Sequence, residues 1–585
     1  MSAEEAASPL RHLLAAEAQA RIAGDDETAD RIARVLAGLV GAPGVAPEAR
    51  IDVTPGRLAD AIRETCDALR AAGSPIYTRG DVVRIYRAPE PTTDSGIRRP
   101  AGAVVVRPVT PEWLRSEMAR VAHYYRVGAR EARWVDPPMD IARIIAAEPD
   151  VGGWPPLRAV IGAPTVLPDG TIVARPGYDA RTGLYLDGPE IPELRPYSAA
   201  EARQAASELR HMLRHYVWVD ETDEAVAIAL LVTAVVRPGI DAAPMIAVDS
   251  PAPGSGKSLL VDAAAIIATG RRAPVMDYGR DPVEAGKRLD AALLAGDGLL
   301  AIDNVEAPLE GAALCQTLTQ PARRIRVLGS HRQAEVPTTC LVVATGNNLT
   351  LRGDIVRRAV VCRIDPGVER PELRRIDQDL LAEVTERRAE LLRHIIGIVA
   401  GYLAAGDRVT IPPLGSYHQW TGCVREPIVW CGLPDPAGTM ERTRAADPSV
   451  TDAVAVFSAW RSAGPEGWTA AEAIEHAESD PDLREALAQV CLRGGRLDAR
   501  TLSYWLRARR DWRVGGMVLR ARRGHRNTSR WVVEGLSHPS SGGDGGDGGD
   551  ISTNARQKTK GIEGAKTSPL SPPSPPASRN GGLKL

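Results

Sequence analysis

The chain has 585 residues, a formal net charge of −2, and a composition that is 44% hydrophobic and 25% charged. This length corresponds to roughly three or four domains. The near-zero net charge excludes a global field that attracts nucleic acid, so any such binding must rest on local charge. The seven cysteines show no C-x-x-C pair or metal-ligand spacing, which favours a reducing compartment and gives no sign of a zinc module.

Hydropathy gives no indication of a membrane segment. The first residues, Met1-Ser2-Ala3-Glu4-Glu5, lack the basic and then apolar regions of a signal peptide. The longest apolar run, Ala225–Val236, is too short to span a bilayer and is predicted to be a buried helix. We therefore expect a cytoplasmic protein with no membrane partner.

The N-terminal third is predicted to be mixed α/β. Helical spacing occurs over 1–40, 57–72 and 110–124, where Thr110-Pro111-Glu112 favours a helix start. Hairpins are predicted over 76–86 and around Pro168-Asp169-Gly170, and a soft linker over 88–100. The basic stretch 125–137 favours a solvated face over a nucleic-acid contact. No catalytic constellation stands out in this third.

A glycine-rich loop follows the apolar run 245–248. It comprises Asp249-Ser250-Pro251-Ala252-Pro253-Gly254-Ser255-Gly256-Lys257-Ser258, and a helical pattern follows from Leu259. Strand, glycine-rich turn, Lys-Ser and helix form a phosphate-binding loop, in which backbone N–H groups and a helix N-terminus face the phosphates. Lys257 is predicted to reach the β/γ-phosphates of ATP, and Ser258 to bind Mg²⁺. The predicted nucleotide-binding residues are Pro253, Gly254, Ser255, Gly256, Lys257, Ser258 and Leu259.

Two observations on this loop oppose each other. Pro251 stands where the motif normally opens with Gly, and proline removes an N–H donor, so a plain Gly/Pro/Ser surface loop is the alternative. However, the chain has 6 lysines against 66 arginines, and four of the six follow residue 550. A phosphate-reaching ammonium is not interchangeable with a guanidinium. The lysine at 257 therefore favours the phosphate-binding interpretation.

Further apolar runs follow the loop, and each ends in polar residues. Leu299–Asn304 ends in the carboxylate of Asp303, which is the form of a Mg²⁺-binding Walker B element. Cys340–Asn348 ends in two amides, and Gly353–Arg358 precedes a last strand over 359–364. Each run alone is common in proteins, whereas their combined order is specific.

Residues 245–364 together resemble the AAA+ ATPases, and among them the superfamily-three helicases and the helicase part of phage and plasmid primase-helicases. The resemblance implies a P-loop AAA+-type parallel sheet with a helical lid, and ATP hydrolysis with Mg²⁺ at the interfaces of a hexameric ring. Asn347 (or Asn348) matches the sensor-1 position, which senses the γ-phosphate and water. Arg357 or Arg358 matches the arginine finger that reaches a neighbouring subunit's nucleotide.

One position departs from the family pattern. The family usually has a second acidic residue directly after the Walker B carboxylate, and here that residue is Asn304. Glu306 lies on the same side of an extended chain and is a possible substitute base. The group that orients the attacking water therefore stays open. The candidate catalytic residues are Lys257, Asp303, Asn304, Glu306, Asn347, Arg357 and Arg358.

A hairpin is predicted over 325–336, with a Gly-Ser tip. In the helicases that the chain resembles, a hairpin at this place lines the central pore and grips single-stranded DNA. His331 and Arg332 at the tip are the candidate contacts. A plain basic hairpin is the competing interpretation.

The C-terminal part is predicted to be a helical lid and a winged helix. Helices over 371–404 match the place of the AAA+ lid, and helical patterns over 450–462, 469–478, 481–492 and from Asp498 precede strands at 514–520 and 530–533. From Arg493 to Arg530 there are twelve arginines and two acids, which favours duplex DNA over a protein partner or a plain Arg-rich surface. The candidate DNA contacts are Arg500, Arg507, Arg510, Arg522, Arg523 and Arg526.

The composition changes after Leu536 to Gly-, Ser-, Asp- and Pro-rich segments that cannot bury apolar area, so 537–585 is predicted to be disordered. The predicted organisation is a mixed α/β region (1–196), an ATPase core (197–367), a helical lid (368–447), a winged helix (448–536) and this tail.

The leading functional hypothesis is an ATP-driven DNA helicase of a phage or mobile-element replication system. The alternative is an AAA+ ATP switch, either a helicase loader or a regulatory DNA-binding adaptor, that does not unwind DNA. A third hypothesis is a primase-helicase fusion, although the N-terminal third shows no zinc-ligand set and no acidic triad.

Overall fold

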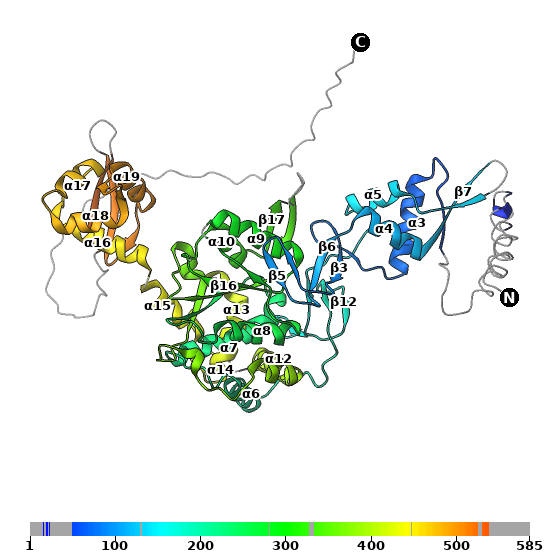
Figure 1. The fold of residues 1–585 in the computed structure, drawn as a ribbon, viewed down its shortest axis with the longest axis horizontal. Helices are drawn as coiled ribbons and strands as arrows, with labels where there is room; N and C mark the ends of the chain where they lie inside the picture. Colours follow the sequence, from blue (N-terminus) through cyan, green and yellow to red (C-terminus); the bar gives the residue numbers. More distant parts are fainter. Residues whose placement is uncertain are drawn as a thin grey trace, which may run out of the picture. The chain divides into compact units, whose positions relative to one another are not determined.

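The computed structural model describes residues 49–536 except 129–131, 280, 327–332, 407, 446 and 524–528, together with residues 16, 19–21 and 23. Its contacts divide the chain into two units, Met1–Glu534 and Gly535–Leu585. The first unit is mixed α/β, with several sheets and helices (Figure 1). The predicted disordered tail, and nearly all of the helical region predicted over 1–40, lie outside the described residues.

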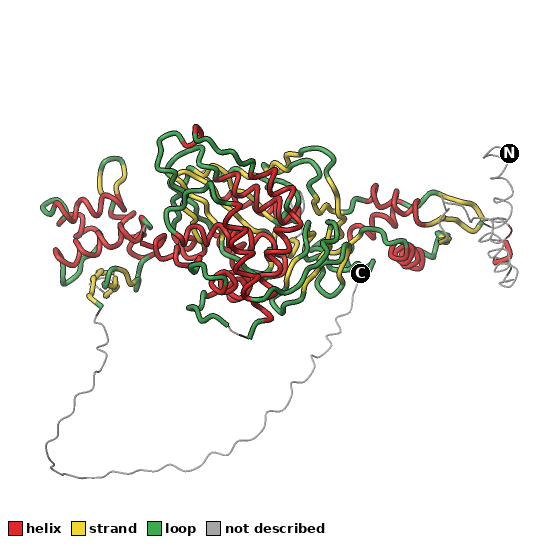
Figure 2. Tube along the Cα trace, turned by 90° about the horizontal axis from the view of Figure 1, so that it is seen from below, coloured by secondary structure: helices red, strands yellow, loops and turns green. Residues whose placement is uncertain are grey.

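The largest sheet has seven strands in the order β20-β14-β19-β16-β15-β5-β4. Its five strands β20 to β15 run parallel, and helices flank these strands in Figure 2. The parallel strands are β14 (Met245–Ser250), β15 (Val275–Met276), β16 (Leu299–Val305), β19 (Leu341–Asn347) and β20 (Ala359–Arg363).

Strand β14 begins as a continuous apolar run because both of its faces are buried. All six of its residues are buried. Ile246 and Val248 belong to one hydrophobic cluster and Met245 and Ala247 to another, because successive side chains point to opposite faces of a sheet. The first cluster contains helices α7 (Glu221–Val236), α8 (Lys257–Thr269) and α12 (Arg388–Ala404), and the second contains α9 (Pro282–Ala295) and α10 (Ala312–Thr319).

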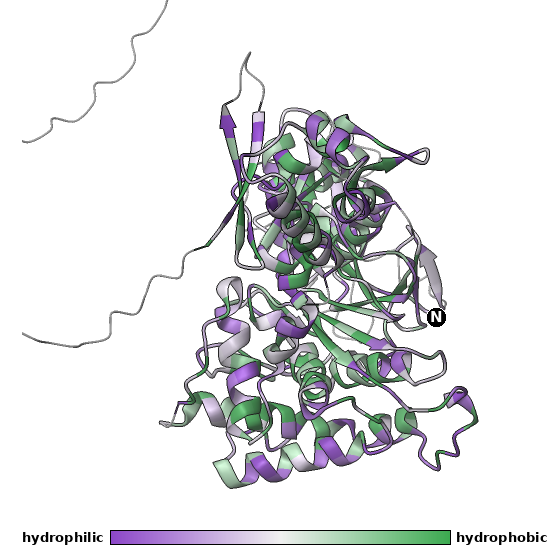
Figure 3. Cartoon of the chain, turned by 90° about the vertical axis from the view of Figure 1, so that its left-hand side faces the viewer, coloured by the Kyte–Doolittle hydropathy of each residue, from purple (hydrophilic) through white to green (hydrophobic). Residues whose placement is uncertain are grey.

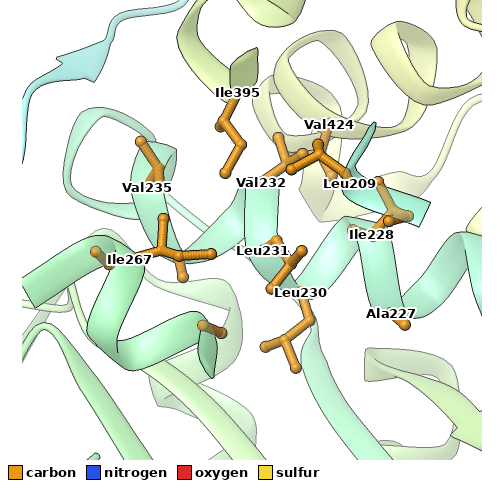
Figure 4. Packing of buried hydrophobic residues seen from close by; sticks show 14 of the residues in the cluster. Leu209, Ala227, Ile228, Leu230, Leu231, Val232, Val235, Ile267, Ile395 and Val424 are labelled. Carbon is orange, nitrogen blue, oxygen red and sulfur yellow. The ribbon is translucent and has the colours of Figure 1, made fainter. Parts of the chain in front are cut away.

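The apolar run 225–236 forms the buried part of helix α7, as predicted. Figure 4 shows Leu231 and Val232 of this helix among side chains that include Ile267 of α8 and Ile395 of α12. Figure 3 shows hydrophobic residues, in green, concentrated on the strands and helices of this core. Within the described residues, no helix combines the length and the hydropathy that a bilayer span requires.

The linker predicted over 88–100 is wrong. Residues 92–99 form an antiparallel hairpin, β4 (Thr92–Asp94) and β5 (Ile97–Arg99), and β5 pairs with β15 of the central sheet. Polar turn residues over this stretch suggest a linker, but Ile97 is fully buried in the core of the central sheet. The N-terminal region therefore contributes two strands to the sheet that carries the glycine-rich loop.

A buried ion pair fixes this hairpin to the sheet. Arg99 of β5 donates from Nε and Nη2 to the two carboxylate oxygens of Asp297, at 2.9 and 2.6 Å. Both side chains are less than 5% exposed, at 4% and 3%. A bidentate guanidinium–carboxylate pair has the geometry that offsets the cost of removing two charges from water.

We expect Asp297→Asn to destabilise the sheet by about 3 kcal/mol, because the Arg99 guanidinium is then buried without a counter-charge. Urea unfolding followed by tryptophan fluorescence measures this loss as a lower midpoint. Asp94→Asn is the matched control, because Asp94 is exposed on the same hairpin and exposed substitutions change stability by less than about 0.5 kcal/mol. Equal midpoints for D297N and the unmodified chain would contradict the structural role of the pair.

The rest of the N-terminal region confirms both predicted hairpins, as β2–β3 and β10–β11. Thr110 caps helix α4 by accepting a hydrogen bond from the Trp113 N–H at 3.3 Å, but the helix ends at Val121, because 122–127 is strand β7. The strands are β1 (Ala49–Asp52), β2 (Ile76–Thr78), β3 (Val82–Arg87), β6 (Val104–Pro108), β7 (Ala122–Val127), β8 (Ala132–Val135), β9 (Ala159–Ile161), β10 (Thr165–Val166), β11 (Ile172–Val173), β12 (Gly177–Asp179) and β13 (Leu184–Leu186). The helices are α3 (Leu58–Ala71), α4 (Pro111–Val121) and α5 (Met139–Ala147).

Helices precede and follow the central sheet as predicted over 198–236 and 371–404, although the second stretch becomes helical only at Leu380. Trp420 is fully buried and donates from Nε1 to Thr233 Oγ1 at 3.0 Å, so the segment around it packs into the core. These helices are α6 (Ala199–Met212), α11 (Leu380–Glu386), α12, α13 (His418–Trp420), α14 (Glu426–Trp430) and α15 (Thr439–Ala445).

The C-terminal helices and strands form their own hydrophobic cluster. Two details differ from the prediction. A short hairpin, β21 (Leu492–Arg493) and β22 (Arg496–Leu497), lies between the last two helices, and a turn at Gly515-Gly516 divides the strand predicted over 514–520. Both glycines of this turn have positive φ, which stops the strand. The elements are α16 (Pro448–Ala463), α17 (Ala470–His476), α18 (Pro481–Cys491), α19 (Ala499–Ala508), β23 (Arg513–Val514), β24 (Met517–Arg523) and β25 (Ser529–Gly535).

Candidate nucleotide-binding site

The glycine-rich loop connects the carboxyl end of β14 to the start of α8, as predicted. Gly254 and Gly256 have φ angles of +73° and +89°, which residues with a side chain rarely adopt. A Cβ on Gly256 would lie 3.2 Å from the Tyr216 ring, and one on Gly254 would lie 3.0 Å from Glu372 Cβ. Glycine is therefore required at both positions by backbone conformation and by close neighbours.

Lys257 lies across this loop with its ammonium at the edge of the sheet. Its Nζ donates to the Ala252 carbonyl at 3.1 Å and to Ser255 Oγ at 3.0 Å. A third hydrogen bond, of 2.8 Å, reaches Asn347 Oδ1 at the end of β19. Burial lowers the pKa of the ammonium, and the nearby carboxylates of Asp249 and Asp303 act in the opposite direction. These carboxylates favour the charged form that a phosphate group requires.

Ser258 and Asp303 also meet, as predicted. Ser258 Oγ donates to Asp303 Oδ1 at 3.0 Å, and Thr345 Oγ1 donates to the same oxygen. Thr345 in turn accepts from the Asn304 N–H at 3.2 Å, which holds β16 against β19. Sequence reasoning gave Thr345 no role, although its position two residues before Asn347 places it on the same face of the strand.

The register of three parallel strands explains this convergence. Ser250 pairs with Asn347, and Ile302, next to Asp303, pairs with Ala344. The carboxyl ends of β14, β19 and β16 therefore lie side by side, and each contributes a polar group there. Hydroxyl and carboxylate oxygens are the ligands that Mg²⁺ prefers, so Ser258 and Asp303 fit this ion. Among the described residues, no group of three or more His, Cys, Asp or Glu side chains forms a self-sufficient metal site.

Glu306 was predicted to lie on the same side of an extended chain as Asn304, but the chain is not regularly extended there. Strand β16 shifts register between Ile302 and Val305, and Asn304 has a φ of +52°. This irregularity breaks the two-residue alternation of a strand. Both Asn304 and Glu306 are exposed, and Asn347 is the amide that contacts Lys257.

Two aromatic residues that sequence reasoning missed support the loop. Tyr216 donates from its hydroxyl to the Gly256 carbonyl at 2.9 Å, and its ring stacks on Trp218 at a centroid distance of 5.0 Å. Burial raises the pKa of Tyr216, so its hydroxyl keeps the proton that it donates. Two aromatics at a spacing of two, in a chain that is only 4% aromatic, were the available signal.

The two candidates for the arginine finger, Arg357 and Arg358, lie at the amino ends of the strands, whereas the glycine-rich loop lies at their carboxyl ends. They directly precede Ala359, which pairs with Met245 at the start of β14. Since the rise is about 3.3 Å per residue, the length of β14 puts them about 17 Å from the loop. Arg358 is only 15% exposed and donates to the Cys315 carbonyl at 2.7 Å, whereas Arg357 is 60% exposed and contacts Asp354. The structure therefore separates the two alternatives: Arg357 is accessible and Arg358 is bonded within its own chain.

An open groove of 540 Å³ adjoins these arginines, and Arg352, Asp354 and Arg358 are among its lining residues. Arg352 is exposed. The Arg357 guanidinium holds the pKa of Asp354 below its usual value, so this carboxylate stays charged. The groove therefore carries charges of both signs, because Glu310 and Asp354 line it together with Arg352 and Arg358, and it lies at the end of the sheet away from the glycine-rich loop.

The predicted DNA contacts fall on two other elements. The hairpin predicted over 325–336 is confirmed as β17 (Ala322–Arg326) and β18 (Gln333–Pro337), but its tip, with His331 and Arg332, lies outside the described residues. On the C-terminal domain, Arg500, Arg507 and Arg510 are exposed. Arg522 forms an ion pair with Glu534, while Arg526 and the side chain of Arg523 lie outside the described residues.

No family model matches this chain, and no curated protein matches it. Among solved structures, two of the C-terminal region of NrS-1 match at 11% identity and a TM-score of 0.32; they cover 80% and 81% of this chain and 98% and 100% of the other. A candidate ATPase from Cytophaga hutchinsonii matches at 15% identity and a TM-score of 0.20, over 34% of this chain and 64% of the other. Scores this low assign neither a family nor an activity.

Proposed function

We propose that this protein binds and hydrolyses ATP at the loop between β14 and α8. The observation that carries the proposal is the convergence of Lys257, Ser258, Asp303 and Asn347 at one edge of a parallel sheet, with Lys257–Asn347 and Ser258–Asp303 contacts of 2.8 and 3.0 Å. A phosphate chain is the ligand that glycine N–H groups, a helix N-terminus and an ammonium recognise together.

Each residue has a role that its position supports. Lys257 contacts the β/γ-phosphates and opposes the charge that develops on them. Ser258 and Asp303 would hold Mg²⁺, which, when bound, neutralises phosphate charge. Asn347, which already reaches the ammonium, is placed to contact the γ-phosphate and the attacking water. Asn304 and Glu306 remain candidates for orienting that water, with Pro253, Ser255 and Leu259 completing the nucleotide pocket.

We further propose that the complete catalytic site needs a second copy of the chain. Arg357 cannot reach the loop of its own chain, because the length of β14 separates them. The exposed guanidinium of Arg357 instead fits a neighbour's triphosphate. Heterologous contacts of this kind form a ring when the rotation between neighbouring subunits closes. A homo-oligomer, in particular a hexamer, is therefore the proposed working form.

The proposed work is done on DNA, as a helicase of a phage or mobile-element replication system. The tip of the β17–β18 hairpin would contact a single strand in the pore of the ring, and Arg500, Arg507 and Arg510 of the C-terminal domain would contact a duplex. The proposed domains are an N-terminal region (1–196), an ATPase core (197–367), a helical lid (368–447) and a winged helix (448–536). Strands β4 and β5 belong to the N-terminal region in sequence but pair with the sheet of the ATPase core.

We expect ATP turnover to rise when single-stranded DNA is added, and the mass in solution to increase with ATP. Strand displacement on forked DNA, by this protein alone, then decides between the two leading functions. Displacement that requires ATP supports a helicase, whereas stimulated turnover without displacement supports the ATP switch that loads or regulates another helicase. ATP turnover that is the same with and without single-stranded or duplex DNA would contradict both functions. Primer synthesis on a single-stranded template would instead support the primase-helicase fusion.

A further inference from the structure

The hairpin β21–β22 stands between α18 and α19 and projects from the C-terminal domain. Gly494 and Gly495 form its two-residue turn, with φ angles of +55° and +80°, a geometry that matches the twist of the two strands. A Cβ added to either glycine would meet no atom within 4 Å. The tip is therefore surrounded by open space among the described residues.

This turn places two arginines directly opposite each other. Arg493 pairs with Arg496 in the register of the hairpin, and both are exposed. Like charges at opposed positions destabilise an antiparallel pair. Within the described part of the chain, neither arginine side chain has a hydrogen bond or an ion pair. The nearest acid is Asp498, which interacts electrostatically with Arg493 but accepts from the Thr501 N–H at 2.7 Å as the cap of α19. A polyanion is the partner that turns this unfavourable pair into a favourable one.

Helix α19, which follows the hairpin, also has exposed arginines. Arg500, Tyr504 and Arg507 are spaced by four and three residues, so they share one face of the helix. Tyr504 is 57% exposed, and the guanidinium carbons of the two arginines lie 5.9 and 6.0 Å from its ring centroid. Leu502 and Leu506 occupy the buried face. The exposed face therefore presents an aromatic ring between two cations.

In the stem of the β24–β25 hairpin, by contrast, arginines form ion pairs with acids. Arg520 pairs with Asp511 at 2.6 Å, and Arg522 pairs with Glu534 at 2.9 Å. These acids pair with two arginines of the stem, whereas the side chains of Arg493 and Arg496 form no ion pair among the described residues. Within the described part of the domain, the β21–β22 hairpin and α19 therefore offer positive charge to a phosphate backbone.

We propose that the β21–β22 hairpin is a DNA-contacting element in its own right, which grips duplex phosphates next to α19. This inference rests on the proposed function, in which the C-terminal domain binds duplex DNA. A major groove about 12 Å wide admits one helix, and phosphates line both of its walls. With α19 in the groove, the hairpin at the N-terminal end of this helix meets the adjoining backbone through Arg493 and Arg496.

The test measures binding of the full-length chain to a fluorescent mixed-sequence duplex by anisotropy, between about 50 and 200 mM salt. Each phosphate contact contributes about 0.9 to the slope of log K against log salt, so Arg493→Ala with Arg496→Ala should lower the slope by about 1.8. Arg461→Ala with Arg484→Ala is the matched control, because both residues are exposed on α16 and α18 of the same domain. ATP turnover without DNA should match in all three proteins, which shows that each is folded.

The outcomes are distinguishable. An unmodified chain that does not bind any duplex removes the DNA part of the proposed function and this inference with it. An unmodified chain that binds, with an unchanged slope in R493A/R496A, overturns the hairpin inference alone. An equal loss in the R461A/R484A control, or an equal loss on single strands of the same sequence, overturns the assignment of the hairpin to duplex phosphates.

Discussion

Replacing Lys257 by alanine is expected to reduce ATP turnover at least about 100-fold while leaving the chain folded. The ammonium is the group at the loop that opposes phosphate charge, and loss of one such electrostatic contact to a transition state costs about 100- to 1,000-fold. The fold should tolerate the change, because Lys257 is partly exposed and its three acceptors lie at the open edge of the sheet. A coupled assay of phosphate release measures the effect, with circular dichroism to check folding.

Lys287→Ala is the matched control for this variant. Lys287 is the other lysine of the ATPase core and forms an exposed ion pair with Glu284 on α9. Exposed pairs of this kind contribute little to stability, so K287A should keep full turnover. Unchanged turnover in K257A would refute the assignment of the loop as a phosphate-binding site, and an equal loss in K287A would show that the effect is not local.

Replacing Arg357 by alanine is expected to reduce ATP turnover about 1,000-fold without weakening ATP binding to the same extent. An arginine supplied by a neighbouring subunit stabilises the transition state, and contacts of this kind are worth about 10³ to 10⁵ in rate. The Arg357 side chain is exposed and contacts only Asp354 among the described residues, so its loss should leave the fold intact. Turnover and the binding of labelled ATP are measured separately.

A mixing experiment tests whether Arg357 acts between subunits. K257A subunits keep Arg357 and R357A subunits keep the loop, so mixed oligomers contain interfaces with both groups and should regain part of the turnover. Arg272→Ala is the control, because Arg272 is an exposed arginine that precedes β15 at the same edge of the sheet. Failure of the mixture to regain turnover would contradict a shared site, and full turnover in R357A alone would eliminate this residue from the reaction.

Arg358→Ala should behave differently from R357A. Its guanidinium donates to the Cys315 carbonyl and to Thr319 Oγ1, which attaches η2 (Gly353–Arg358) to α10. Removing these bonds and the ion pair with Asp354 detaches η2 from α10, so lower stability is the primary effect. The sequence cannot distinguish two adjacent arginines, because exposure depends on which neighbouring element packs against each of them.

The sequence was sufficient to predict an element wherever the residues of one short segment determine its conformation. The apolar run before the loop, the glycines within it and the capped helix starts are properties of short stretches, and the structure confirms them at β14, α8 and α4. The two predicted N-terminal hairpins were confirmed for the same reason. A strand's membership of a sheet is different: residues 92–99 are mostly polar and turn-rich, and only pairing with β15 shows that they extend the central sheet.

By itself, the sequence determined that a glycine-rich loop, a strand ending near Asp303 and a strand ending at Asn347 follow one another, because these signals are local residue types and spacings. Only the tertiary structure decided that β19 lies between β14 and β16, so that Lys257 meets Asn347 and Ser258 meets Asp303. It also decided that Tyr216 supports the loop from 40 residues away and that Arg357 faces outward at the other edge. Strand order and packing join residues that are distant in the chain, and no local pattern encodes which of them will meet.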